Sequence, residues 1–302
     1  MSGELIFRVE GEDHPIELAD GFAPETLRAV TGLVPAAIDI HCAKIAGCHI
    51  MWPVPFLARL EAAQDVLSMP PGAFFYWPER QYLEITYDAL QAEAAEVNYL
   101  GRLKHDPAWL RDYAERQRRE QGRAVFTAEL LPGPGLQPAH RPEPAPVAEP
   151  LATVRRARIA AWEAEPEEIA ELLGRRGQMI PFGPLHMAEG EMRKLHELLW
   201  RLWEGRGETR SDADKRKIAV FALKAAISRV AGFCHLLETG AVLEAGIACL
   251  EDGACETDAA LEDLILYCGR IAAWLDLHIC WWPMNETTLG ALGATDTEGR
   301  ES

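Results

Sequence analysis

Short runs in which apolar and polar residues alternate fill the first hundred positions of the chain, and this period-two pattern predicts β-strands. The runs are Leu5 to Val9, His14 to Leu18, two within Ile38 to Trp52, Ala73 to Trp77, and Tyr82 to Tyr87. Turn residues such as Pro70-Pro71-Gly72 separate them, and Pro24 opens one short helix. Many short strands at close spacing are typical of a small barrel or sandwich.

Helical periodicity replaces alternation in the second half of the chain. A charged helix is predicted from Pro107 to about Gln121, and Ser211 caps a long helix further on. The apolar stripe expected on that long helix is Ile218, Phe221, Ala225, Val230, Phe233 and Leu237. A second stripe, from Leu261 to Trp282, ends before Pro283. Four or five amphipathic helices with short joints predict an antiparallel bundle.

Proline and glycine are concentrated between Leu131 and Pro150, which is typical of an extended linker. We therefore expect an α+β protein of two domains. Residues 1–130 form a small β-barrel with a trailing helix, 131–150 the linker, 151–295 an all-α helical bundle, and 296–302 a disordered tail.

Composition narrows the class of protein. The 302 residues are 48% hydrophobic and 25% charged, as in a globular protein, and no apolar run reaches the length of a membrane span. The net charge of −17 argues against non-specific binding to nucleic acid, which needs a basic surface. The N-terminus does not resemble a signal peptide, and an odd number of cysteines, seven, is typical of reduced thiols in a cytoplasm.

Motifs for cofactors are missing or misplaced. The Gly-x-Gly pair, Gly133 and Gly135, lies in the linker with no strand before it, so a bound dinucleotide is not expected. His196-Glu197 begins a zinc-protease pattern, but Trp200 stands where the second histidine is needed.

Two histidines and two cysteines lie close together in sequence, between His41-Cys42 and Cys48-His49. A hairpin that turns near Ile45 would place His41 opposite His49 and Cys42 opposite Cys48, with the two pairs on opposite faces. Four ligands divided in this way cannot surround one tetrahedral ion. We expect no cofactor and no metal.

Titratable residues recur on the predicted strands. Asp39 and His41 share one face of their strand, whereas Cys42 and Lys44 share the other. Tyr76 and Glu84 lie in strands that otherwise read as apolar. Such groups on neighbouring strands are suited to proton transfer in a confined pocket.

The order of short motifs along residues 5–103 resembles that of the small cyclophilin-like barrel families of bacteria. These motifs are Ala23-Pro24-Glu25-Thr26, His41 with Gly47, Trp52-Pro53, Pro71-Gly72 leading to Tyr76, Glu84-Ile85-Thr86-Tyr87, and Asn98-Tyr99. Such a barrel followed by a separate helical bundle is similar to the cucumopine and mikimopine synthases, in which the match over the second half is one of architecture.

This resemblance implies a reaction as well as a fold. Cucumopine synthases join L-histidine to 2-oxoglutarate by a Pictet–Spengler reaction that uses no reductant. The amine condenses with the ketone to an iminium, the imidazole carbon attacks it, and a base removes the ring proton.

Roles for residues of this chain follow as hypotheses. Glu84 is the first choice for the base and His41 the second, while Tyr76 or protonated His41 would be the acid. We expect Glu84, with Tyr82 and Thr86, to face the barrel interior. The side chains expected to hold the substrates are Lys44, His49, Arg80, Asn98 and Arg102.

A competing hypothesis is a non-catalytic protein, in which the barrel binds a small ligand and the bundle oligomerises. A third is an isomerase or hydrolase built on the same barrel. A barrel lined with polar groups would favour the enzyme, and an apolar barrel the binder. In either case we expect small-molecule partners, a homo-oligomer, and neither nucleic acid nor membrane.

Overall fold

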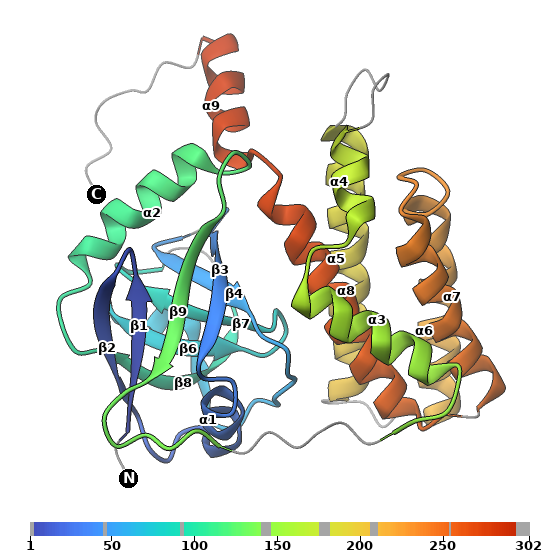
Figure 1. The fold of residues 1–302 in the computed structure, drawn as a ribbon, viewed down its shortest axis with the longest axis horizontal. Helices are drawn as coiled ribbons and strands as arrows, with labels where there is room; N and C mark the ends of the chain where they lie inside the picture. Colours follow the sequence, from blue (N-terminus) through green and yellow to red (C-terminus); the bar gives the residue numbers. More distant parts are fainter. Residues whose placement is uncertain are drawn as a thin grey trace.

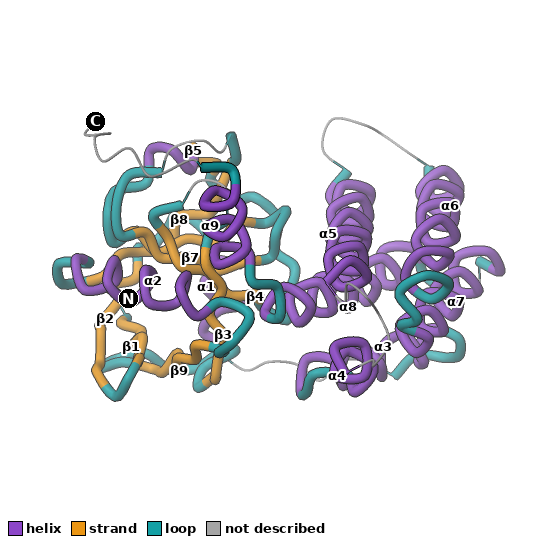
Figure 2. The backbone as a smooth tube through the Cα atoms, turned by 90° about the horizontal axis from the view of Figure 1, so that it is seen from above, coloured by secondary structure: helices purple, strands orange, loops and turns teal. Residues whose placement is uncertain are grey.

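The computed structural model describes residues 3–44, 47–90, 94–139, 146–174, 182–205, 211–253 and 255–293. Figure 1 shows a β-barrel beside a group of helices, and Figure 2 shows the same two parts from above. This arrangement confirms the predicted barrel domain followed by a helical region. The expected tail at 296–302 lies outside the described residues.

The N-terminal domain is a closed barrel of eight antiparallel strands. In spatial order they are β2 (Glu12–Leu18), β1 (Glu4–Val9), β9 (Phe126–Pro132), β3 (Ala36–Cys42), β4 (His49–Pro53), β7 (Tyr82–Thr86), β6 (Ala73–Trp77) and β8 (Glu96–Leu103). Pairing of β2 with β8 closes the barrel. The short β5 (Ala63–Asp65) pairs with β8 alone, and α1 (Pro24–Thr31) and α2 (Ala108–Glu120) flank the barrel.

Gly101 permits the closure. A Cβ atom at this position would lie 2.2 Å from the carbonyl oxygen of Glu17, and the backbone φ of +154° is one that other residues rarely adopt. The strands β2 and β8 therefore approach here at a distance that only glycine allows.

β9 was not foreseen from the sequence. It follows α2 and pairs with both β1 and β3, so the barrel needs it to be complete. Its last two residues, Leu131 and Pro132, belong to the segment that we expected to be linker. The alternation in Phe126–Pro132 covers only seven residues and runs directly into the proline-rich segment, which hides it.

The barrel interior is apolar. Trp52 stacks between Phe7 and Phe74, with ring centroids 5.6 and 6.1 Å apart, and Ile50, Leu83 and Ile85 complete the packing around them. Leu83 and Ile85 point inwards, so Tyr82, Glu84 and Thr86 point outwards, because successive side chains on a strand face opposite sides. The expectation that Glu84 faces the barrel interior is therefore wrong.

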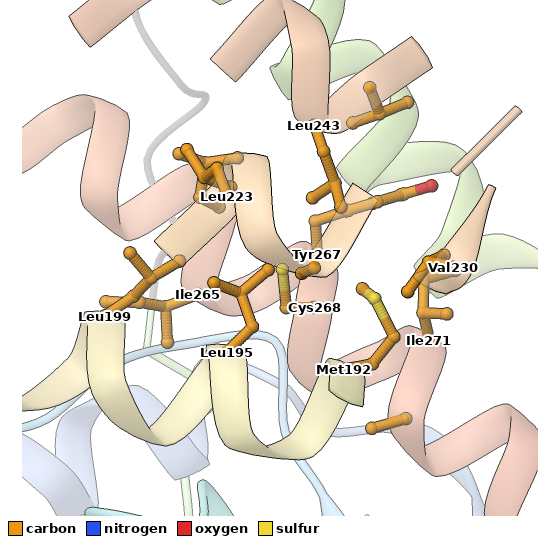
Figure 3. Packing of buried hydrophobic residues seen from close by; sticks show 14 of the residues in the cluster. Met192, Leu195, Leu199, Leu223, Val230, Leu243, Ile265, Tyr267, Cys268 and Ile271 are labelled. Atoms are coloured by element: carbon orange, nitrogen blue, oxygen red, sulfur yellow. The ribbon is translucent and has the colours of Figure 1, made fainter. Parts of the chain in front are cut away.

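The helical domain contains six of the helices that the structure describes. They are α3 (Leu151–Glu163), α4 (Glu167–Gly174), α5 (Phe182–Glu204), α6 (Asp212–Val230), α7 (Leu237–Asp252) and α8 (Thr257–Leu277). Helix α8 packs against α3, α5 and α7 and also contacts β4 of the barrel. Figure 3 shows the core between these helices, with Met192 and Leu195 of α5 facing Cys268 and Ile271 of α8.

The last described helix, α9 (Trp281–Ala291), packs against α2 on the barrel side of the molecule (Figure 1). The sequence predicted one helix through Trp282, but α8 ends at Leu277 and a new helix begins at Trp281. No single described helix is long and apolar enough to cross a membrane, whereas α8 and α9 reach that length and composition together only across a 48° bend.

The stripe predicted for α6 is mostly on the wrong face, although Val230 is buried as expected and Ile218 is partly buried against the core. Phe221 and Phe233 are 76% and 56% exposed, and the helix ends at Val230, before Leu237. The buried positions are Ala219, Leu223, Ala226 and Val230, which also recur at helical spacing. The predicted stripe was chosen because it contains two large aromatic residues, Phe221 and Phe233. The buried face instead contains the smaller Ala219 and Ala226, which allow the neighbouring helices to pack closely.

This reassigned face can be tested by a pair of truncations. Leu223→Ala should lower the free energy of unfolding by about 2–5 kcal/mol, because it removes a fully buried side chain. Phe221→Ala, two residues away on the same helix, should change it by only about 0.5 kcal/mol or less. Urea denaturation of both variants measures the difference, and a larger loss for Phe221→Ala would contradict the assignment.

Candidate functional site

The barrel and the helical domain meet on the outer face of β3, β4 and β7. Along this face, Asp39 and His41 of β3 lie beside Met51 and Pro53 of β4 and Tyr82 and Glu84 of β7. Helix α8 contacts β4 and Arg193 of α5 reaches Tyr82, so Tyr82 and Glu84 are buried on this face although they do not reach the barrel core. The covered face is a second buried environment, outside the barrel.

A cavity of about 180 Å³ lies within this interface, and we call it the interdomain cavity. Its lining residues are Ala43, Lys44, His49, Met51, Trp77, Arg80, Tyr82, Glu84, Glu189, Arg193 and Trp281. Three of them are cationic, Lys44, Arg80 and Arg193, and two are carboxylic, Glu84 and Glu189. The cavity therefore offers a small ligand three cationic donors, each of which also has a carboxylate partner in the protein.

Asp276 of α8 joins the two domains beside this cavity. Its Oδ2 atom is 2.8 Å from Nδ1 of His41, and its Oδ1 atom accepts hydrogen bonds from Nζ of Lys44 and, at 2.9 Å, from Nε1 of Trp281. The carboxylate is 1% exposed, so these partners replace the water that it loses. It positions one group from β3, one from the loop after β3 and one from α9.

Burial changes the acid–base properties of the histidines and the lysine. Desolvation lowers the pKa of His49 to about 4, and desolvation with the nearby Lys44 charge holds the pKa of His41 well below its usual value. Both imidazoles are therefore neutral at pH 7. Desolvation also lowers the pKa of Lys44 to about 7, so this amine can give up or take a proton near neutral pH.

Glu84 is the most enclosed carboxyl group that lines the cavity. It is 1% exposed, and its Oε2 atom lies 3.4 Å from Nε2 of His49. On the opposite wall, Glu189 of α5 is 2.6 Å from Arg193, one helical turn away. Burial raises the pKa of Glu189, but the charges of Arg193 and Lys44 outweigh that effect and hold its pKa below the usual value. Glu189 thus remains an anion that fixes these cations in place.

Two more cationic side chains border the site. Arg80 forms an ion pair of 2.7 Å with Glu197 of α5 and lies over the ring of Trp77. Arg193 reaches the hydroxyl of Tyr82 at 3.5 Å. Both guanidinium groups therefore come to the cavity already held in position.

Five residues proposed from the sequence are brought together here. Lys44, His49, Arg80 and Glu84 line the cavity, and His41 lies next to it, with its ring 5.8 Å from that of Tyr82. Lys44 was expected on the face opposite His41. It shares Asp276 with His41 because β3 ends at Cys42, and strand alternation does not hold beyond that residue.

The other three candidates lie elsewhere. Tyr76 points into the barrel core, where it packs against Phe56 and its hydroxyl accepts a 3.4 Å bond from the Ala58 amide. Asn98 hydrogen-bonds Thr26 and the backbone of the 59–61 segment. Arg102 is exposed on β8.

The hairpin register also differs from the expected one. His41 pairs with Met51, and Cys42 pairs with Ile50, so His41 is not directly opposite His49. The expected turn residue, Ile45, lies outside the described residues. Among the described residues, no group of three or more His, Cys, Asp or Glu side chains is arranged to hold a metal ion.

Sequence reasoning missed the contribution of the helices. The sequence did not suggest Glu189, Arg193 or Asp276 as site residues. The first two lie on α5 and the third on α8. A signal was present, because Asp276 interrupts the apolar run from Ala272 to Leu277 and Glu189 follows the buried Leu185 by one helical turn. A charged residue on an otherwise apolar helical face indicates that a partner of opposite charge or a hydrogen-bond donor is buried beside it, because charged side chains are rarely buried unpaired.

These features define a protein class: a closed barrel joined to a helical domain, with a polar cavity between them. No protein-family model matches the sequence, and no curated protein is similar to it. Among solved structures, that of McbB in complex with tryptophan has the same fold, with a TM-score of 0.75 over 94% of this chain and 99% of that one, at 18% identity. The hypothetical protein AF2241 from Archaeoglobus fulgidus matches 43% of this chain and 94% of its own at 20% identity, with a TM-score of 0.32.

The interdomain role of Asp276 can be tested by an isosteric change. Asp276→Asn should lower the free energy of unfolding by about 1–3 kcal/mol, because it weakens the buried hydrogen bonds from His41, Lys44 and Trp281, while Glu189 remains 3.9 Å from Lys44 as a counter-charge. Asp112→Asn, on the exposed side of α2, is the matched control and should have little effect. Chemical denaturation monitored by circular dichroism gives both values, and equal stabilities would refute this role.

Proposed function

We propose that this protein is a condensing enzyme that joins an aromatic amino acid to a 2-oxo acid by a Pictet–Spengler cyclisation. L-histidine with 2-oxoglutarate is the first candidate pair, because the order of the barrel motifs resembles that of the cucumopine synthases. The tryptophan bound to McbB makes L-tryptophan a second candidate for the amine. One observation carries the proposal, namely that the buried carboxyl group of Glu84 opens onto a small cavity with three cationic side chains.

Glu84 is the base in this proposal. Once the ring carbon has attacked the iminium, the ring carries an extra proton, and its removal restores aromaticity. A carboxylate enclosed with little water is a stronger base than one in solution, because burial disfavours its charged form. His49, 3.4 Å from Glu84, orients the carboxyl group and is itself neutral at pH 7.

The proton for the loss of water from the carbinolamine comes from Lys44. Tyr76 is on the other side of the barrel wall, and His41 is neutral because burial lowers its pKa. Lys44 lines the cavity with a pKa of about 7, which suits a general acid at neutral pH. Amine and ketone thus combine with release of one water molecule, and the lysine regains its proton from solvent.

Carboxylate binding falls to Arg80 and Arg193. Both line the cavity, and guanidinium groups bind carboxylates through two parallel hydrogen bonds. Asn98 and Arg102 have no part in this scheme, since neither reaches the cavity.

Ligand binding without a reaction is the competing function, and the apolar barrel interior favours it. The polar residues that would favour an enzyme are present, but on the outer face of the barrel and in contact with the helices. Because these polar residues are enclosed together with the carboxyl group of Glu84, they support catalysis more strongly than the apolar barrel interior supports simple ligand binding.

Incubation with pairs of substrates tests the proposal. The full-length protein, without added nicotinamide, should convert L-histidine or L-tryptophan with 2-oxoglutarate or another 2-oxo acid into a product whose mass is the sum of the two minus one water. The open-chain imine has the same mass, but treatment with borohydride adds two hydrogens to the imine and leaves the cyclic product unchanged. High-resolution mass spectrometry after this treatment therefore distinguishes the two. No such product from any aromatic amino acid would leave the binding function as the better explanation.

Replacement of the base should affect turnover rather than binding. Glu84→Gln keeps the shape of the side chain, and we expect kcat to fall roughly 10²–10⁴-fold with little change in KM. Tyr76→Phe, which alters only the barrel core, is the control and should retain near-normal kcat. Steady-state kinetics that gave the opposite order would reverse the assignment of these residues.

The role of Lys44 predicts a pH dependence. If Lys44 donates a proton, kcat should fall as the pH rises above about 7, because the amine is then increasingly deprotonated. Lys44→Arg preserves the positive charge but releases no proton near neutrality, so kcat should fall and its decline above pH 7 should disappear. A Lys44→Arg enzyme with wild-type kcat and a raised KM for the oxo acid would show that Lys44 only anchors the substrate.

A further inference from the structure

Pairing between β3 and β4 is confined to one end of the two strands. These strands form only two residue pairs, His41 with Met51 and Cys42 with Ile50, while Ala36 to Ile40 pair with β9 on their other edge. Trp52 and Pro53 pair with β7 and have no partner on β3. The two strands therefore diverge beyond these pairs, while Trp52 and Leu130 behind them remain 1% exposed.

A cavity of about 520 Å³ lies where the two strands diverge, and we call it the β3–β4 crevice. Its floor includes Trp52 and Leu130, which belong to the barrel core, and Ile38. Its cover comes from the helical domain, with Ile159 and Trp162 of α3. An apolar space closed by aromatic side chains suits a flat ring.

Charged groups stand at one end of the crevice. Arg270 of α8 is 6% exposed, lies over the rings of Trp274 and Trp162 at 3.7 and 5.1 Å, and forms a 3.0 Å bond with Asp39 of β3. Its Nε atom, like Nε1 of Trp52, is buried with no hydrogen-bond partner in the described part of the chain. An adjacent cation and anion with spare donors suit a zwitterion.

The crevice and the interdomain cavity are neighbours. Asp39 precedes His41 by two residues on β3, and Pro53 follows Met51 by two on β4, so the two spaces lie about 7 Å apart along the same face. A ligand whose charged end lies at Asp39 therefore points towards Glu84 and Lys44.

Size decides how two substrates share these spaces. The interdomain cavity, at about 180 Å³, is smaller than the roughly 300–1,000 Å³ of small-molecule sites, so it is too small for an aromatic amino acid and an oxo acid together. The crevice, at about 520 Å³, falls within that range. A second space is thus required, and the structure offers one beside the first.

We propose that the β3–β4 crevice binds the aromatic amino acid, with its ring against Ile159 and Trp162 and its ammonium and carboxylate groups at Asp39 and Arg270. The ammonium end then faces the oxo acid in the interdomain cavity, and after condensation the ring folds over the iminium so that its proton comes to Glu84. That second step rests on the proposed condensation, whereas binding of the amino acid does not.

Calorimetric titration of the full-length protein tests binding in the absence of oxo acid. At least one of L-tryptophan, L-histidine, L-tyrosine and L-phenylalanine should bind. For L-tryptophan, the analogues tryptamine and indole-3-propionate should bind at least about tenfold more weakly, since each lacks one charged group. Absence of binding by all four amino acids, or equal affinity for the analogues of the one that binds, would overturn the assignment.

A variant that fills the crevice gives an independent test. Ile159→Trp adds a large ring at a position that is 39% exposed, so the fold should tolerate it, while the affinity for the amino acid should fall at least about tenfold. Arg156→Trp on the same helix is the matched control, because its side chain is 65% exposed and does not line the crevice. Unchanged affinity in Ile159→Trp would refute the proposal.

The two proposals fail in different ways. If the amino acid binds, Ile159→Trp blocks it and no oxo acid yields a product, the crevice assignment stands and the condensation is wrong. If the product forms and Ile159→Trp leaves the KM of the amino acid unchanged, the condensation stands and the crevice assignment is wrong. Glu84→Gln should bind the amino acid like the wild type in either case.

Discussion

The buried carboxylate of Asp276 is the interaction on which the arrangement of the two domains depends. It accepts hydrogen bonds from three donors that come from the barrel side and from α9, and it has almost no contact with water. A carboxylate in this environment is tolerated only while its partners are present. The docking of α8 on the barrel and the positions of His41 and Lys44 are therefore coupled.

The packing of the barrel explains why the candidate site lies outside it, at the interface that Asp276 stabilises. The interior is filled by apolar side chains, among them the stacked rings of Phe7, Trp52 and Phe74, and by Tyr76, whose hydroxyl bonds the Ala58 amide. Each strand has a second face, however, and where helices cover that face it too becomes dry. Glu84 and His49 are buried on this second face, and Glu189 and Arg193 approach them from α5. Neither domain has a complete site by itself.

The interface also contains two spaces of different chemistry. The smaller combines five charged side chains with aromatic and aliphatic ones, and the larger is mainly aromatic and aliphatic, with Asp39, Arg158, Glu163 and Arg270 at its edges. The divergence of β3 from β4 creates the larger space, and the early end of β3 at Cys42 brings Lys44 into the smaller one. Small irregularities in two strands thus determine what each space can bind.

The sequence by itself determined the class of fold, because alternation and helical periodicity are local signals. β6 was predicted at its observed bounds, and the start of α6 at Ser211 is confirmed by the bond from the Asp214 amide to the serine hydroxyl. Glu84, His49, Lys44 and Arg80 were also proposed as site residues from their types and positions. Their roles remain proposals.

Only the tertiary structure decided which face of each element is functional. Alternation states that Glu84 and Leu83 point in opposite directions, but not which direction is inward, because in β7 both faces are buried. The inward positions of Tyr76 and Leu83, the buried face of α6 and the partners of Asp276 all depend on contacts between residues far apart in the chain. Such contacts leave no periodic trace in the sequence, so packing alone fixed them.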